Sequence, residues 1–305
     1  MPEVVEVALT SMFLDYTLKN KDITKINVLG GRYTRNELKG LTLVRYPLKV
    51  ISVDSKGKFV WFVLKRPDNS LLYLMNTFGL EGEWTTDKQK HSDIEFVYDG
   101  KSLYFTDQIK YGTMEITNDI KVLNKKLNKL GPDLLKETFT EDEFYNRVHN
   151  YLYKNNKLNV SRANKEIIKV LMDQTTPLGS GLGNYLAVES LYTSKISPYT
   201  KLIDLYNNRE RLNKLSKAIK KTIKLSFINS DTGYLDHIDE SLGVFIKKLR
   251  SKDKIHNLFH PATNIGIKKF KFNVYRQQKD PHGNNIKASK IIPGRTTYWS
   301  PTIQK

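Results

Sequence analysis

The chain has 305 residues and no cysteine, and its 50 lysines and arginines outnumber its 32 aspartates and glutamates, for a formal net charge of +18. The length predicts two or three domains, and the missing cysteines exclude disulfides, thiolate nucleophiles and zinc–thiolate sites. The charge indicates a polyanionic partner: nucleic acid is favoured over a merely solvated lysine-rich surface or a membrane surface. We find neither an apolar run long enough to cross a bilayer nor a signal peptide, and therefore expect an intracellular protein of the cytoplasm or nucleus.

After a short opening helix, residues 22–118 are typical of β structure. Segments rich in β-branched and aromatic residues alternate with Gly, Pro, Asn and Asp; they read KINVLG, TLVRY, KFVWFVL, LLYLMN, IEFVYDG and KSLYFTD. This pattern predicts an antiparallel sandwich or barrel.

Gly131 and Pro132 in NKLGPDLL end the strand pattern, and helical periodicity follows over residues 140–228. The expected helices are TEDEFYNRVHNYLY, NKEIIKVLMDQ, NYLAVESLYTS and the lysine-rich RERLNKLSKAIKKTIKLSFI, whose basic face is either solvated or in contact with DNA. Residues 230–265 look irregular. Residues 268–304 return to β structure, with FKFNVYRQ and GRTTYWS as the two arms of a hairpin.

The opening MPEVVEV carries a candidate nucleophile. If Met1 is removed, Pro2 becomes an N-terminal secondary amine, and α-amino groups have a pKa near 7.7–8.0 against about 10.4 for lysine. Such an amine can attack a sugar C1′ and form an iminium ion, for which Glu3 is suitably placed as an acid–base group. The alternative is structural, because proline and glutamate both suit the first turn of a helix.

Four segments in this order resemble motifs of the Fpg/Nei DNA glycosylases, the formamidopyrimidine-DNA glycosylases and endonuclease VIII-like enzymes: MPEVVEV, NKLGPDLL, LMDQTTPLGSGLGNYLAVESLY and GRTTYWSPTIQK. The resemblance implies an α+β multidomain fold. An N-terminal helix and an antiparallel β-sandwich would form a catalytic domain over residues 1–130, followed by a linker over 131–138. A helix–two-turn–helix domain would occupy residues 139–260, and a β-hairpin finger residues 261–305.

The same resemblance implies a bifunctional DNA glycosylase/AP lyase of base excision repair. Such an enzyme removes oxidised bases, cleaves the strand by β- and δ-elimination, and needs no cofactor. Pro2 matches the nucleophile, Glu3 the acid–base residue and Glu6 a supporting carboxylate. Lys58 in SKGKFVWF matches the family's β-domain lysine, which contacts a phosphate and is counted as catalytic. Val4 and Val5 replace the Gly-Pro or Leu-Pro usual in the family, which loosens the constraint on the first helix.

Two further residues match DNA contacts of the family. Asn184 matches the phosphate-binding residue of the Gly-rich turn, and such turns and helix N-termini attract phosphate. Arg295 matches the catalytic, phosphate-gripping arginine at the finger tip, where its planar fork offers bidentate geometry.

The finger itself departs from the metal-bearing members of the family. The places of their two cysteine pairs fall at His282, Asn285, Ser300 and Ile303, which form no zinc site. The chain therefore resembles the zincless-finger subgroup, and we expect Tyr298 and Trp299 to pack the finger, with Trp299 buried against the helical domain.

Leu80, Ile109 and Tyr111 match the side chains that fill the gap left by the flipped nucleotide. The family often has arginine where this chain has Ile109, and isoleucine cannot read the orphaned base by hydrogen bonds. The resemblance thus implies damaged duplex DNA as the partner, with weak discrimination of the opposite base or a preference for single-stranded and bubble DNA. We expect a monomer without membrane contact.

The sequence leaves several alternatives open. A catalytically impaired DNA-binding protein on the same scaffold is one, and a tautomerase-type enzyme that uses a proline amine is another. Formamidopyrimidines, hydantoins and oxidised pyrimidines all remain open as substrates.

Overall fold

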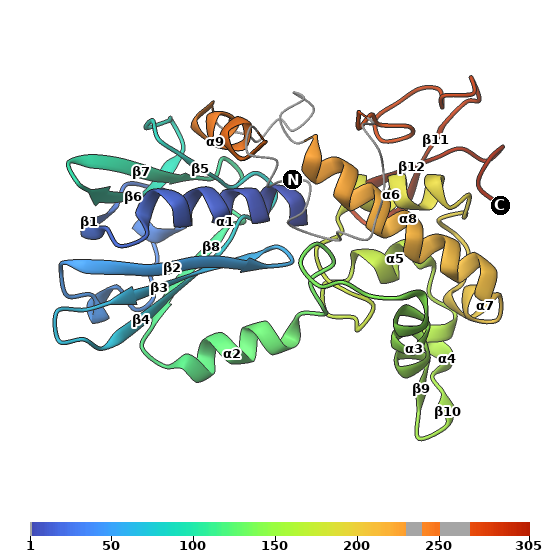
Figure 1. Ribbon diagram of the computed structural model, residues 1–305, viewed down its shortest axis with the longest axis horizontal. Helices are drawn as coiled ribbons and strands as arrows, with labels where there is room; N and C mark the ends of the chain where they lie inside the picture. Colours follow the sequence, from blue (N-terminus) through green and yellow to red (C-terminus); the bar gives the residue numbers. More distant parts are fainter. Residues whose placement is uncertain (1, 230–239, 251–268) are drawn as a thin grey trace. The chain divides into compact units, whose positions relative to one another are not determined.

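A computed structural model describes residues 2–229, 240–250 and 269–305 (Figure 1). These residues divide into two compact units. The first contains residues 2–129 and 240–250, and the second contains residues 130–229 and 269–305. The finer division implied by the resemblance, with a linker over 131–138 and a separate finger from 261, stays a prediction. No helix among the described residues is long and apolar enough to cross a membrane.

The first unit is built on one antiparallel sheet of eight strands in the order β5-β7-β6-β1-β2-β3-β4-β8. The strands are β1 Asp22–Val28, β2 Leu48–Lys56, β3 Phe59–Lys65, β4 Leu71–Thr77, β5 Glu83–Thr85, β6 Ser92–Tyr98, β7 Lys101–Thr106 and β8 Thr113–Thr117. The helices are α1 Val4–Leu18, α2 Ile120–Lys129 and α9 Glu240–Arg250, with 3-10 turns at η1 Gly31–Thr34 and η2 Leu41–Leu43.

The sheet folds into two layers between β1 and β2. These strands pair at only two positions, Asp22 with Lys49 and Ile23 with Leu48. Side chains of the layers then meet in one aromatic core, where the Phe62 ring of β3 lies 5.6 Å from Trp84 of β5 and 5.7 Å from Phe96 of β6. The expected α+β fold with an antiparallel sandwich is therefore confirmed.

Helix α1 carries apolar residues on most of its faces, and other elements of the unit cover these faces. Ser11 Oγ donates to Ser55 Oγ of β2 at 2.9 Å, and on another face the Phe13 ring lies 6.1 Å from Phe245 of α9. Val4 and Val5 are both buried, and the helix begins at Val4.

Two expectations for this unit are corrected, and three of its elements were not expected. TLVRY is not a strand: it overlaps η2, and the strand starts only at Leu48, because Pro47 has no N–H for the ladder. Residues 240–250 form helix α9 instead of irregular structure, while 230–239 and 251–265 lie outside the described residues. The short strands β5 and β8 and helix α2 were not expected; β5 and β8, with three and five residues, are too brief for a period-2 pattern to mark them.

The second unit is mainly helical. Its elements are α3 Glu141–Leu152, β9 Tyr153–Lys154, β10 Lys157–Leu158, α4 Val160–Ala163, α5 Ile167–Met172, α6 Asn184–Thr193, α7 Leu202–Tyr206, α8 Arg209–Ile228, β11 Lys287–Ile292 and β12 Arg295–Trp299. Helix α6 lies in its centre, in contact with α5, α8 and β12. Tyr185 of α6 hydrogen-bonds Ser226 of α8 at 3.1 Å between the hydroxyl oxygens.

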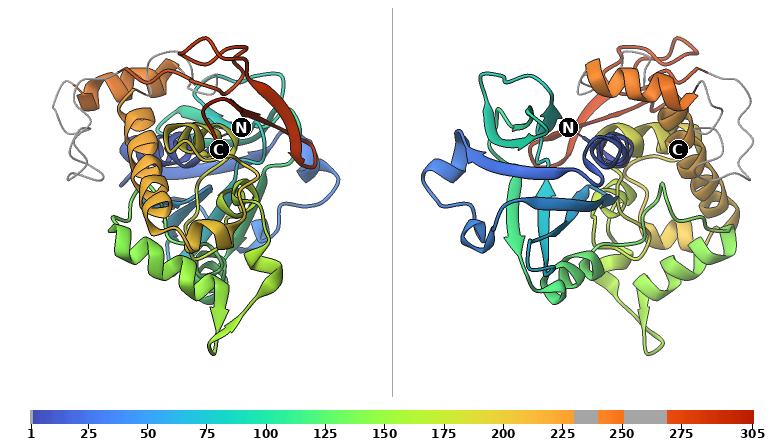
Figure 2. Two further views of the ribbon diagram at one scale, coloured as in Figure 1. Left: turned by 90° about the vertical axis from the view of Figure 1, so that its right-hand side faces the viewer. Right: turned by 60° about the vertical axis from the view of Figure 1, so that its left-hand side comes forward.

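A C-terminal hairpin is present, but its first arm differs from the prediction. Strand β11, which reads KASKII, pairs with β12, and the ladder closes on Ile292 and Arg295 around Pro293 and Gly294 (dark red in the left-hand view of Figure 2). Gly294 has φ +71°, and proline followed by such a glycine is the pair that a type II turn favours. FKFNVYRQ forms no strand, because a buried carboxylate described below takes its backbone N–H groups.

Candidate active site and nucleic-acid interface

The candidate nucleophile lies at the buried start of α1. Glu3 is the N-cap residue of α1, and its backbone N–H donates to Glu6 Oε2 at 2.8 Å. The side chains form a capping box, and Glu3 and Glu6 are only 1% and 3% exposed. Glu6 therefore fixes the backbone at Glu3, and through it the direction in which Pro2 leaves the helix. Pro2 is itself buried.

Lys58 lies at the same end of this unit. It follows Gly57 in the two-residue turn between β2 and β3, and Gly57 has φ +56°, as the first position of a type II′ turn requires. Asp15 of α1 accepts the N–H of Val53 at 2.8 Å, whereas Ser11 bonds Ser55. The helix thus runs antiparallel to β2, and its N-terminus points toward this turn (Figure 1).

The rise per residue of a helix and of a strand gives the distances of Glu3 and Lys58 from a shared contact, and these distances are similar. From the Ser11–Ser55 contact, Glu3 lies about 12 Å back along the helix and Lys58 about 10 Å forward along the strand. The half-buried Lys58 and the Pro2–Glu3 pair therefore come from segments far apart in sequence and reach one edge of the unit.

Two loops of the first unit bring Leu80 and Tyr111 together. Gly79 has φ +62°, and a Cβ there would lie 2.5 Å from the backbone nitrogen of Gly112 and 2.9 Å from the Cβ of Tyr111. Glycine is required for this close approach. Leu80, next to Gly79, is half-buried, while Tyr111 is 61% exposed.

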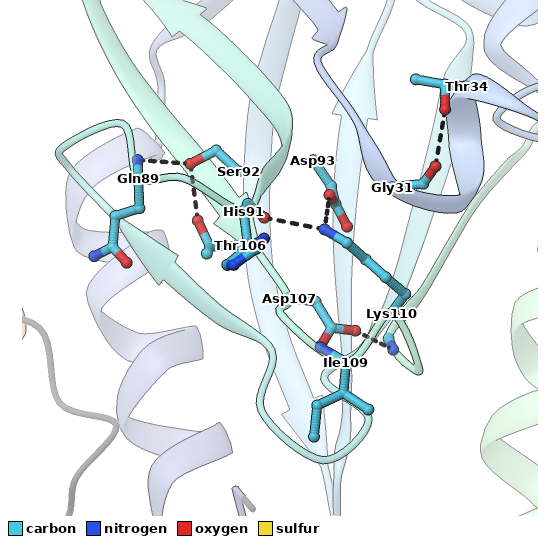
Figure 3. Close-up of polar contacts among 11 residues, drawn as sticks. Gly31, Thr34, Gln89, His91, Ser92, Asp93, Thr106, Asp107, Ile109 and Lys110 are labelled. Carbon is cyan, nitrogen blue, oxygen red and sulfur yellow. Dashed lines mark hydrogen bonds and ion pairs between the residues drawn. The ribbon is translucent and has the colours of Figure 1, made fainter.

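Carboxylates hold the loop that carries Ile109 (Figure 3), and Tyr111 belongs to the same loop. Asp107 accepts the N–H of Ile109 at 3.1 Å and that of Gly112 at 2.5 Å. Lys110 adopts the left-handed conformation, with φ +63°, and its ammonium group pairs with the buried Asp93. The side chain of Ile109, next to Lys110, lies at the surface and is 39% exposed.

Asp93 is a buried acid that forms an ion pair with Lys110. Burial raises the pKa of Asp93 above its ordinary value, and the Lys110 ammonium opposes that rise. A Cβ at Gly31 would lie 2.4 Å from the Asp93 carboxylate, so a glycine is also needed to leave room for this acid. Sequence reasoning missed Asp93 and Asp107.

In the second unit, Asn184 and Arg295 lie close together. Asn184 is the first residue of α6, and its Nδ2 donates to the Thr296 carbonyl at 2.8 Å. Arg295 precedes Thr296 directly and begins β12. The Asn184 amide thus ties the helix start to the finger. The predicted phosphate contact of this residue stays a prediction.

Gln174 shapes the turn before α6. Its Oε1 accepts the N–H of Gly181 at 2.7 Å, and its Nε2 donates to the Leu182 carbonyl at 2.9 Å. Gly181 has φ +114°, a conformation that other residues rarely adopt. Gln174 therefore holds a turn whose glycines the sequence already singled out.

The four positions that match zinc-ligand places do not fit a zinc ion. His282 is the one imidazole among them, and amide, hydroxyl and alkyl side chains stand at Asn285, Ser300 and Ile303. No group of three His, Cys, Asp or Glu side chains among the described residues could hold a metal.

A buried carboxylate, that of Asp280, joins the segments around His282 and Ser300, two of the positions that match zinc-ligand places. Asp280, 5% exposed, accepts the N–H of His282 at 2.9 Å, the N–H of Asn284 at 3.0 Å and the hydroxyl of Ser300 at 2.8 Å. Burial alone raises the pKa of Asp280, but the hydrogen bonds from Asn284 and Ser300 outweigh it and hold the pKa below its ordinary value. Asp280 thus links residues 20 positions apart in the chain.

Asp280→Ala is expected to destabilise the second unit by about 2–3 kcal/mol, because these three donors and the side-chain amide of Asn284 lose a charged acceptor. A lowered folded pKa means that the contribution is present at neutral pH and is lost as the pH falls through that pKa. Urea unfolding at neutral pH measures the difference. Asp204→Ala, at an exposed aspartate of the same unit, is the control. Equal stability of the two variants would contradict the role of Asp280.

Trp299 is half-buried, not buried as expected. Its indole N–H donates to Ser289 Oγ across the hairpin at 3.0 Å, and its ring lies 5.5 Å from that of Tyr199, edge to face. The hydrogen bond from the indole N–H to Ser289 holds the Trp299 side chain at the partly exposed surface of the hairpin.

Glu189 of α6 anchors the segment before the hairpin. It is 1% exposed, and its carboxylate accepts the N–H groups of Asn273, Val274 and Tyr275 at 2.9–3.0 Å. Burial raises the pKa of Glu189 although these hydrogen bonds oppose the rise. These N–H groups are therefore not available to a strand ladder.

Comparison with known proteins identifies the family. The model of the formamidopyrimidine-DNA glycosylase N-terminal domain matches residues 1–114, and that of the C-terminal domain matches residues 263–305. Formamidopyrimidine-DNA glycosylase of Ligilactobacillus salivarius is 30% identical over 66% of this chain and 68% of its own. The enzyme of Prochlorococcus marinus is 29% identical over the full length of both chains.

A solved structure shows the same fold. Wild-type Fpg of Lactococcus lactis, in complex with DNA containing an oxidised pyrimidine, superposes over the whole of both chains with a TM-score of 0.72 at 20% identity. Two family models cover the beginning and the end of the chain, and relatives extend across the rest. The chain therefore belongs to the Fpg/Nei family of DNA glycosylases.

Proposed function

We propose that the protein removes oxidised bases from DNA and cleaves the strand at the resulting site, with the nitrogen of Pro2 as nucleophile. The observation that carries this proposal is the start of α1. There a capping box holds Glu3 beside a buried Pro2, at the edge of the unit that Lys58 also reaches. The names of the curated relatives support the substrate class, because formamidopyrimidines are products of purine oxidation.

The first step is displacement of the base. Once Met1 is removed, the lone pair of the Pro2 nitrogen attacks C1′ and the glycosidic electrons leave with the base, which takes up a proton. Glu3 supplies acid–base assistance at the ring oxygen or the leaving base. The attack gives an aminal, with loss of the proline N–H proton; cleavage of the C1′–O4′ bond, with a proton taken up by O4′, then opens the sugar to an iminium cation. Since proline is a secondary amine, this iminium carries no N–H proton whose loss could neutralise it.

The second step is strand cleavage. The iminium ion acidifies C2′; loss of a C2′ proton expels the 3′ phosphate, and a further elimination expels the 5′ phosphate. Lys58 and Arg295 offer cationic groups to the phosphates beside the lesion. The reaction needs no cofactor.

The loops of the first unit bear on which opposite bases and which forms of DNA the protein accepts. Leu80 and Tyr111 lie at neighbouring loops, as gap-filling side chains must, and Ile109 presents only an alkyl group at the surface. Because it offers no hydrogen bond to the orphaned base, we propose little preference among opposite bases and good activity on bubble and single-stranded DNA.

A panel of defined oligonucleotides tests the proposal. Each carries one formamidopyrimidine, hydantoin or oxidised pyrimidine, in duplex opposite each of the four bases, in a bubble and as a single strand. We expect excision of at least one lesion class, with rates that differ less than about tenfold among opposite bases. The two fragments of the cleaved strand should both end in phosphate where the damaged nucleotide was removed.

Glu3→Gln, which keeps the shape of the side chain, is the matched control and is expected to lose excision. Binding of damaged DNA without excision of any lesion would instead favour the alternative, an inactive DNA-binding protein on this scaffold.

A further inference from the structure

A basic groove runs along α8 in the second unit. One cavity of about 720 Å³ lies between α8, the C-terminal half of α6 and residues 269–273. A second, of about 500 Å³, continues along α8. Both are lined by Thr193, Lys195 and Lys221, so the two cavities form one depression, here called the α8 groove.

The α8 groove is lined by cations. Seven lysine and arginine side chains line it: Lys195, Arg211, Lys214, Lys217, Lys221, Lys269 and Lys271. Lys214, Lys217 and Lys221 follow one another at helical spacing on one face of α8. The lysines at 269 and 271 alternate with Phe270 and Phe272.

Little negative charge offsets these cations. Glu189 lines the first cavity, but its carboxylate already accepts the backbone N–H groups of residues 273–275. Lys214 pairs with Glu210 at 2.6 Å, and Arg211 donates to the main-chain oxygen of Lys305 at 2.7 Å. Within the part of the chain that the structure describes, Lys195, Lys217 and Lys221 have no carboxylate within ion-pair distance. The groove therefore holds uncompensated charge suited to phosphates.

Aromatic side chains lie among these lysines. Phe272 lines the groove and is half-buried, with its ring 5.1 Å from that of Tyr275 and 5.7 Å from that of Tyr185. Tyr192 lines the same cavity but is only 8% exposed, so Phe272 carries the stacking argument. A cationic channel with aromatic rings is the arrangement that binds single strands, because bases stack on the rings while lysines follow the backbone.

The α8 groove is separate from the predicted phosphate contacts of Asn184 and Arg295. Asn184 begins α6, whereas Thr193 ends it, about 14 Å away along the helix, and Lys195 follows two residues later. A helix C-terminus carries partial negative charge, so its dipole does not attract phosphate. The lysines must supply the attraction.

We propose that the α8 groove binds a single strand of nucleic acid, as a second site beside the one used for base excision. A duplex turns its bases inward and presents a convex backbone, which suits neither the depression nor the rings. This inference goes beyond the proposed function, and its test uses undamaged DNA.

The test compares Lys217→Glu/Lys221→Glu with Lys154→Glu/Lys157→Glu. The control makes the same change in net charge at exposed lysines of the β9–β10 hairpin, which line neither cavity. Binding of a fluorescein-labelled oligothymidylate is measured across a salt series. We expect the groove variant to bind about tenfold or more weakly, with a salt slope smaller by about 1.4, as for two lost phosphate contacts on a single strand. The control should stay close to the wild type.

Photo-crosslinking gives an independent readout in the unaltered protein. A single strand with 5-iodouracil should crosslink to peptides that contain Tyr192 or Phe272. Equal loss of binding in both variants, crosslinks confined to peptides outside the groove, or tighter binding to phosphatidylserine vesicles than to oligothymidylate would each overturn the proposal. Excision from a short duplex should stay unchanged in the groove variant.

Discussion

A form of the protein that retains Met1 is expected to lose covalent trapping on abasic-site DNA. Borohydride reduces the iminium ion between Pro2 and C1′ to a stable amine, so the processed protein should form a complex visible on a denaturing gel. With Met1 in place, the Pro2 nitrogen is an amide without a nucleophilic lone pair. The trapping rate should fall by a factor on the order of a thousand or more, as for loss of a nucleophile.

Two variants refine this prediction. Pro2→Gly keeps an N-terminal amine but makes it primary, and the iminium ion it forms can lose its N–H proton to give a neutral imine, so trapping should be weaker yet detectable. Lys58→Ala keeps Pro2 and should still trap abasic DNA. Undiminished trapping by the Met1-retaining form, together with loss in Lys58→Ala, would assign the nucleophile to the lysine instead.

The second large effect is expected at the finger. Arg295→Ala should slow excision of a damaged base by about 100-fold, since losing one charged phosphate contact costs about 2–3 kcal/mol. Cleavage at a preformed abasic site should stay within about fivefold of the wild type, because a nucleotide without a base is easier to extrude. Single-turnover rates on DNA with a damaged base and on DNA with a preformed abasic site measure the difference between the two effects.

Lys290→Ala is the matched control, because it removes one exposed positive charge from strand β11 of the same hairpin. Both rates should stay near the wild type in that variant. An Arg295→Ala protein that excises as fast as Lys290→Ala would show that the arginine does not grip the flipped nucleotide's phosphates.

Local patterns predicted most of the elements. The helices α3, α6 and α8 and the long strands β3, β4, β6 and β7 follow from hydrophobic periodicity and turn residues within each segment. The turns also carried their own signals: Gly57 and Gly79 stand where left-handed backbone is needed. The order of the motifs along the chain implies one function for Pro2, Glu3 and Lys58.

Contacts between distant residues account for what the sequence missed. FKFNVYRQ has a strand-like composition, yet Glu189, more than 80 positions earlier, takes its N–H groups. Asp280 joins Ser300 across the finger, and Asp93 meets Lys110 between a strand and a loop. No local period marks such pairs, because each residue alone is compatible with an exposed polar position.

Peptide mapping of the borohydride-reduced complex tests the central claim most directly. The intact processed protein is reacted with abasic-site DNA, reduced, digested and sequenced by tandem mass spectrometry. The account predicts that the reduced sugar is attached to the nitrogen of Pro2, in a peptide that begins with Pro2 and lacks Met1. Attachment to the side chain of Lys58 or of any other lysine would contradict it.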